Sequence, residues 1–192
     1  STKGYDLNVN YTGLEIGRFG SLNFNLTGTY LDELITDPGP GIDSYDCVGY
    51  FSSVCSAVLP GTPTPEWRHR FRTSWITPWD VDVSLTWRHY DGVTGLAAPN
   101  TEMPTDATCV PVPPATTCTG RIDRVLNSEN YYDLSANWAV TEKADVTLGI
   151  NNLLDDNPAL SASVGTTGNG NTFPQTYDAL GRYVFLRARV AF

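Results

Sequence analysis

The sequence has 192 residues, a formal net charge of −9 and a pI of about 4.5. A nucleic-acid-binding domain needs a basic surface, so this acidic balance argues against nucleic acid as a partner. The chain is long enough for one domain with a core, but no apolar run approaches the roughly 20 residues of a membrane-spanning helix.

Seven segments alternate apolar and polar residues with the period of two that predicts β-strands, and we expect no helix. The alternation begins near Tyr5, Leu22, His69, Val81, Tyr132, Val146 and Gly181. In the last segment the apolar file consists of Val184, Leu186, Ala188, Val190 and Phe192. The other file contains Arg187 and Arg189, so a shift of this strand by one residue would exchange the surroundings of both arginines.

The connections between these segments alternate in length. Short connections span residues 12–21, 77–80 and 141–145, whereas long ones rich in Gly, Pro, Ser, Thr and Asn span residues 34–65, 91–130 and 152–181. In an antiparallel meander, this alternation places all the turns at one end and all the long loops at the other.

These features predict an all-β fold, an antiparallel transmembrane β-barrel segment of about seven strands. Strands of about ten residues with aromatic residues near their ends are typical of such barrels, whose outer face is apolar and whose lumen is polar. Alternation also fits a soluble sandwich, so a secreted carbohydrate-binding β-sandwich remains an alternative. A small closed barrel with an eighth strand from residues 47–58 is another.

Four cysteines lie in the long loops at spacings that fit no standard zinc site. The simplest of the three pairings joins Cys47 to Cys55 and Cys109 to Cys118, and pairing between the loops stays open. Disulfides would place the chain in an oxidising compartment.

No residue pattern predicts catalysis, a metal or a cofactor. His69 and His89 lack a nucleophile motif, and we expect both at the extracellular rim, although an outer-membrane enzyme is kept as an alternative. Asp155 and Asp156 do not have the spacing of an EF-hand, and with Pro158 they fit a turn better than a calcium site.

Two side-chain sets are weak candidates for ligand contacts. Aromatic loop residues would either stack on a ligand or pack the loops together: Tyr45, Tyr50, Phe51, Phe173 and Tyr177. The second set consists of the arginines Arg68, Arg70, Arg72, Arg88, Arg121 and Arg124. They would either bind a ligand or form a charge network on the lumen wall. The acidic partners in that network would be Glu66, Asp82, Asp91, Asp123 and Asp133. The acidic first loop argues against a strongly anionic ligand.

The order of several motifs carries a family resemblance. "TKGYDLNVNY", "GSLNFNLTGTYLDE", "PEWRHRFRTSWITPWDVDVSLTWRHY", "YYDLSANW" and "VTLGINNLLDDNPAL" precede the closing strand. Together they resemble the C-terminal part of a TonB-dependent outer-membrane receptor. The closing strand also resembles the signal read by the barrel assembly machinery, carried here by Tyr183, Leu186, Ala188, Val190 and Phe192.

The resemblance implies a protein of the Gram-negative outer membrane that takes up a scarce nutrient, such as an iron–siderophore, a cobalamin-like compound or an oligosaccharide. The family's barrel has about 22 strands around an N-terminal plug. Residues 1–192 would therefore be the C-terminal barrel part, with the plug, export signal and earlier strands outside this sequence. Its partners would be outer-membrane lipid, the barrel assembly machinery, the rest of the receptor and, only through the missing N-terminal part, TonB.

Overall fold

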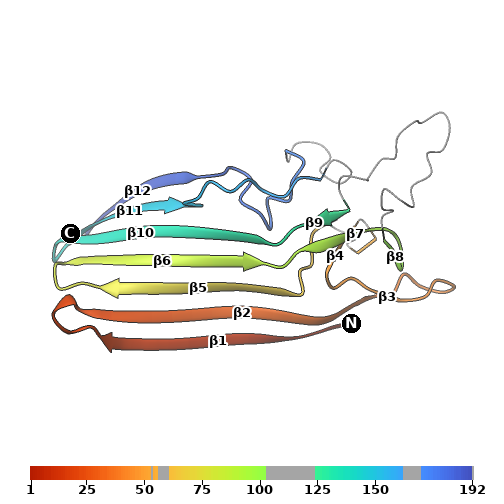
Figure 1. Cartoon of the computed structure of the whole chain (residues 1–192), viewed down its shortest axis with the longest axis horizontal. Helices are drawn as coiled ribbons and strands as arrows, with labels where there is room; N and C mark the ends of the chain where they lie inside the picture. Colours follow the sequence, from red (N-terminus) through yellow and green to blue (C-terminus); the bar gives the residue numbers. More distant parts are fainter. Residues whose placement is uncertain (53, 56–60, 103–123, 162–169, 192) are drawn as a thin grey trace.

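The computed structural model describes the whole chain except residues 53, 56–60, 103–123, 162–169 and 192. Seven long strands form one antiparallel sheet in which the order of the strands follows the order of the chain (Figure 1). They are β1 (Thr2–Glu15), β2 (Ser21–Thr36), β5 (Trp67–Ile76), β6 (Val81–Tyr90), β10 (Glu129–Thr141), β11 (Ala144–Asn151) and β12 (Tyr183–Val190). All seven predicted strands are confirmed, and several are longer than the alternation indicates.

The turns and loops lie at opposite ends of this meander, as expected (Figure 1). One 3-10 turn, η1 (Gly17–Phe19), lies in the connection between β1 and β2 and is the one helical element that the described residues contain. None of the described segments forms a helix long and apolar enough to cross a membrane.

The long loops carry short strands of their own. β3 (Tyr45–Asp46) pairs with the end of β2, and β4 (Tyr50–Phe51) pairs in parallel with β7 (Val93–Ala98). β7 also pairs with β8 (Thr101–Glu102) and β9 (Val125–Leu126). The small closed barrel would need an eighth wall strand from residues 47–58. The described part of this segment instead forms β4, which belongs to a small sheet among the loops.

The register aligns one apolar row and one polar row across neighbouring strands. Consecutive Cα partners from β1 to β12 form the row Tyr11, Phe24, Thr73, Leu85, Leu134, Ile150 and Val184. The adjacent row on the other face consists of Asn10, Asn25, Arg72, Thr86 and Asp133. Because side chains alternate between faces, the sheet has an apolar face along all seven strands and a polar face from β1 to β10.

The apolar face remains exposed. Leu186 on β12 is 71% accessible and its Cα partner Leu148 on β11 is 52% accessible. A sandwich would cover this face with a second sheet, so the single-layer sheet is not the alternative fold. Hydrocarbon lipid would bury the same face, as in a barrel wall.

Aromatic pairs lie on this face near both ends of the strands. Trp75 and Trp79 meet edge to face at the turn end, with ring centroids 6.1 Å apart. Trp87 and Tyr132 stack at 6.4 Å near the loop end. The arrangement matches the two aromatic girdles of a transmembrane barrel.

The buried core lies among the loops, beyond the end of the wall. It combines side chains from all three long loops and from the start of β10: Phe51, Val93, Leu126, Tyr131, Phe173 and Tyr177. The loops therefore pack on one another and form a layer over the polar face at that end of the sheet.

Candidate ligand site on the polar face

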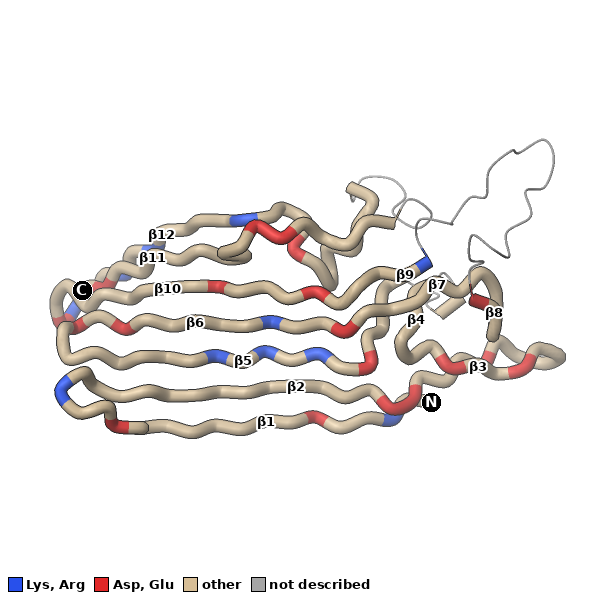
Figure 2. The backbone as a smooth tube through the Cα atoms, viewed as in Figure 1, with Lys and Arg blue, Asp and Glu red and all other residues tan. Residues whose placement is uncertain are grey.

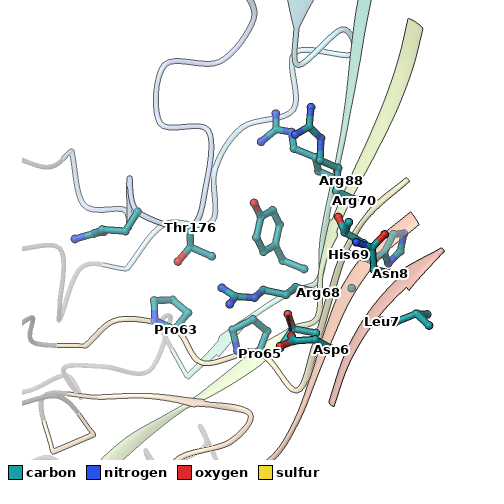
Figure 3. Close-up of a pocket in the computed structure, with 15 residues that line it drawn as sticks. Asp6, Leu7, Asn8, Pro63, Pro65, Arg68, His69, Arg70, Arg88 and Thr176 are labelled. Carbon is teal, nitrogen blue, oxygen red and sulfur yellow. Dashed lines mark hydrogen bonds between the residues drawn. The ribbon is translucent and has the colours of Figure 1, made fainter. Parts of the chain in front are cut away.

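A cavity of about 490 Å³ lies between the polar face and the loop layer (Figure 3). Strands β1 and β2 line the cavity with Asp6, Asn8, Thr27 and Thr29. Strands β5 and β6 contribute Arg68, Arg70, Arg88 and Tyr90. The loops close it with Pro63, Pro65, Gln175 and Thr176. A second cavity of about 590 Å³ adjoins it, since Arg70 and Arg88 line both. The volumes are in the range of small-molecule sites.

Three arginines occupy alternate positions of β5, which appear blue in Figure 2. Their register with Asn25 and Thr86 places their positive charge on the polar face. Arg72 donates a hydrogen bond of 2.9 Å to Ser84 Oγ and does not line either cavity. Arg68 and Arg70 are exposed, and neither forms an ion pair with any residue that the structure describes. In Figure 3 the Arg68 side chain extends from the sheet towards the loop residues Pro63 and Thr176.

Arg88 differs from them because two carboxylates neutralise it. It donates two hydrogen bonds of 2.8 and 2.9 Å to Asp133 on β10 and two of 2.9 and 2.5 Å to Asp178 in the third loop. The guanidinium also lies over the Tyr131 ring, 5.1 Å from its centroid. Arg88 therefore fixes the third loop to the wall, next to the cavity.

The Arg88–Asp133 pair agrees with the predicted charge network on the lumen wall. Asp178 was missed by sequence reasoning, since a carboxylate in a long loop gives no periodic signal of which strand it contacts. Arg124 pairs with Glu102 between β9 and β8, outside the wall. Arg121 and Asp123 lie outside the described residues.

Four of the five aromatic candidates are buried in the loop layer. Phe51, Phe173 and Tyr177 belong to the loop core, and Tyr45 is 5% exposed with its hydroxyl donating 2.6 Å to Val54 O. Burial raises the pKa of the Tyr177 phenol. Their contacts favour loop packing over ligand stacking, and Tyr50 is half-buried.

The disulfide Cys47–Cys55 is formed within the first loop, as the simplest pairing predicts. Cys109 and Cys118 lie outside the described residues, so their pairing remains a prediction. Cys47 is fully buried, which places the disulfide inside the loop layer.

Asp155 and Asp156 lie in a tight turn. Asn152 is fully buried, and its side chain exchanges two hydrogen bonds, of 2.8 and 2.9 Å, with the backbone of Asp156. Asp155 Oδ1 accepts 2.7 Å from the amide of Arg182, just before β12. The described residues contain no group of three or more His, Cys, Asp or Glu that would hold a metal ion.

His69 and His89 face each other at the loop end of β5 and β6, on the face opposite Arg68. Both residues thus lie at the end of the wall next to the long loops, and the extracellular position of this end remains a prediction. The assembly residues Tyr183, Leu186, Ala188 and Val190 lie on β12, with Tyr183 on the other face from the rest, and Phe192 is outside the described residues.

An antiparallel meander with an exposed apolar face, a polar face, short turns and a layer of long loops is a wall segment of a transmembrane β-barrel. No family model matches the sequence, and no curated protein matches it. Solved structures do match, and the following three are receptors.

A variant of the ferric enterobactin receptor PfeA from Pseudomonas aeruginosa aligns over 98% of this chain with a TM-score of 0.55 and 16% identity. Another PfeA variant, in complex with enterobactin, aligns over 98% with a TM-score of 0.54 and 15% identity. The siderophore receptor PiuA from Acinetobacter baumannii aligns over 97% with a TM-score of 0.50 and 20% identity. The chain spans about a fifth of these proteins, 22% of PfeA and 21% of PiuA. At this identity the likeness establishes the fold, and the predicted resemblance is confirmed at that level.

Proposed function

We propose that this chain is the C-terminal barrel wall of a TonB-dependent outer-membrane receptor, in which it contributes to the uptake of a scarce nutrient. The observation that carries the proposal is the match of nearly the whole chain to siderophore receptors, together with a loop-covered cavity on the face that would line the lumen. Receptor neighbours and the absence of a predicted catalytic motif favour transport over catalysis.

The edges of the sheet support a larger assembly. β1 is exposed along all 14 of its residues, and β12 ends the sheet on the other side. Backbone groups at an edge have no water to bind inside a bilayer, so both edges need partner strands. In the proposed receptor the earlier strands supply them, lipid covers the apolar face, the barrel assembly machinery recognises β12, and the missing N-terminal part contacts TonB.

Among the three nutrient classes, the arginines favour an anionic iron–siderophore. Arg68 and Arg70 face the cavity without carboxylate partners among the described residues, so they raise the local positive potential there. Two carboxylates of the acidic first loop are held in place by hydrogen bonds from neutral donors and keep their negative charge. Asp46 accepts hydrogen bonds of 3.0 Å from two backbone amides, and Glu66 accepts 2.8 Å from the Tyr30 hydroxyl.

The test uses the complete protein that contains this chain, produced in a Gram-negative strain lacking its own siderophore receptors. Outer membranes are examined on boiled and unboiled gels with an antibody to residues 109–118. A band several times larger than 21.0 kDa that shifts on boiling is the expected result. No membrane signal would refute the receptor assignment.

Ligand binding is then measured with radioiron-labelled catecholate, hydroxamate and carboxylate siderophores, and with a neutral oligosaccharide for comparison. The double variant Arg68→Gln/Arg70→Gln should weaken siderophore binding about 10- to 100-fold, the effect of removing one or two charge-assisted hydrogen bonds. Arg72→Gln is the matched control, since Arg72 lies on the same strand and face but outside the cavity. Equal binding by all three proteins would refute the assigned site.

A further inference from the structure

The two histidines of the chain form a contact pair at the loop end of the wall. His69 and His89 are Cα partners on β5 and β6, and their rings stack at 28° with centroids 5.2 Å apart. The Trp87 ring meets His69 edge to face at 4.4 Å. The pair is on the apolar face, opposite the arginines of the proposed ligand site, and His69 is also among the residues that line the cavity.

Both ring nitrogens of His89 face oxygen acceptors. Nε2 lies 2.9 Å from Asp91 Oδ1, and Nδ1 lies 2.9 Å from Asn130 Oδ1. A neutral imidazole has one N–H and one lone pair, so it would direct a lone pair at one of these oxygens. Only the imidazolium donates to both.

The orientation of the Asn130 amide is fixed by a third residue. Trp87 Nε1 lies 2.9 Å from the same Asn130 oxygen, and an indole nitrogen only donates. Turning the amide around would place its NH₂ group against the indole N–H. The oxygen therefore faces both Trp87 and His89, which excludes an Asn130 donor to His89 Nδ1.

His69 has the opposite requirement. Trp67 Nε1 donates 2.9 Å to His69 Nδ1, so this nitrogen carries a lone pair and the ring is neutral, protonated on Nε2. These contacts are therefore satisfied when His89 is an imidazolium and His69 is neutral. A neutral ring beside an imidazolium also avoids repulsion between two like charges at this distance.

We infer that the pair binds a single extra proton, held on His89, and that the His89 imidazolium clamps the base of the second long loop. Asp91 directly follows β6 and Asn130 lies at the start of β10, so the ring joins the two points where this loop leaves and rejoins the wall. The loop carries Val93 and Leu126 of the loop core, next to the clamp. The charged or titratable groups that face His89 are His69 from β5 and Asp91 from the loop.

The sign of the pH dependence follows from these contacts. The clamp is complete while His89 is protonated. When His89 loses this proton, one of its two hydrogen bonds is lost and a lone pair faces an acceptor. The base of the second loop should therefore open more often at alkaline pH than at mildly acidic pH.

The first test reads the protonation directly. The complete protein is labelled with ¹⁵N-histidine in detergent, and its imidazole signals are assigned by difference with His89→Gln and His69→Gln. At a pH where one of the two rings is charged, His89 should show two protonated nitrogens and His69 one acceptor nitrogen. A neutral His89 beside a protonated His69 would overturn the inference.

The second test reads the loop by hydrogen exchange of the amides of Asp91 and Thr94, which donate to Trp67 O and Gly49 O. Going from about pH 6 to about pH 8, the exchange corrected for its intrinsic pH dependence should rise about tenfold, the effect of one lost charge-assisted hydrogen bond. His89→Gln should abolish this change and His69→Gln, the matched control, should retain it. Equal pH dependence in the wild type and His89→Gln would refute the clamp. Because this readout needs no siderophore, its outcome is independent of the ligand assignment.

Discussion

Replacing Arg88 with glutamine should free the third loop from the wall. Arg88 donates four hydrogen bonds of 2.5 to 2.9 Å to Asp133 and Asp178, and its side chain is 20% exposed. Removing one partner from a buried ion pair costs about 3–5 kcal/mol, and the adjoining cavities place this site near the lower value. A cost of about 3 kcal/mol corresponds to roughly a hundredfold more frequent opening of the loop.

Hydrogen exchange of the third loop measures this opening. The amides to follow are those of Tyr177 and Gly181, which donate to Phe173 O at 2.9 Å and to Asp178 O at 3.1 Å. Asp178→Asn should loosen the same amides, whereas Asp133→Asn should also expose the amide of Asn152, which donates 3.0 Å to Asp133 Oδ1.

Arg72→Gln serves as the matched control, because within the described residues the Arg72 side chain donates one hydrogen bond, to Ser84 on the same face. A double-mutant cycle of Arg88→Gln with Asp178→Asn should give a coupling energy of about 1–3 kcal/mol. If Arg88→Gln leaves the exchange of Tyr177 and Gly181 unchanged, the loop core alone holds the third loop and the reasoning is wrong.

Two further predictions concern the wall. Leu148→Arg should lower the free energy of unfolding in a bilayer by about 2–4 kcal/mol, because Leu148 lies on the apolar face. Thr147→Arg on the polar face should lower it far less. Urea unfolding of the complete protein in lipid vesicles compares the two variants, and equal losses would contradict the assignment of the faces. Gly149→Ala should cost about 1–3 kcal/mol, because a Cβ there would lie 2.2 Å from the Phe185 ring, and Phe185→Leu should recover part of that loss in the same assay.

The architecture was predictable from the sequence because a strand's alternation is a local property. The alternation of Leu186 and Ala188 with Arg187 and Arg189 assigns the faces of β12 without any knowledge of its neighbour. Chain order and connection length were enough for the meander, since a short turn forces antiparallel neighbours. The disulfide Cys47–Cys55 was also accessible, because its two cysteines are only eight residues apart.

The site depended on contacts that no local pattern contains. Arg88 and Asp178 are 90 residues apart, and only the packing of the third loop over β6 brings them together. The same packing buries Phe173, which the sequence left equally open to ligand stacking. Alternation places His69 and His89 on one face of the sheet. The inference that His89 holds the proton of the pair depends on the strand register, which sets its ring between Asp91 and Asn130. The sequence by itself thus determined the wall and its two faces, through backbone periodicity, while the loop layer, the arginine roles and the histidine clamp were decided by long-range contacts in the folded chain.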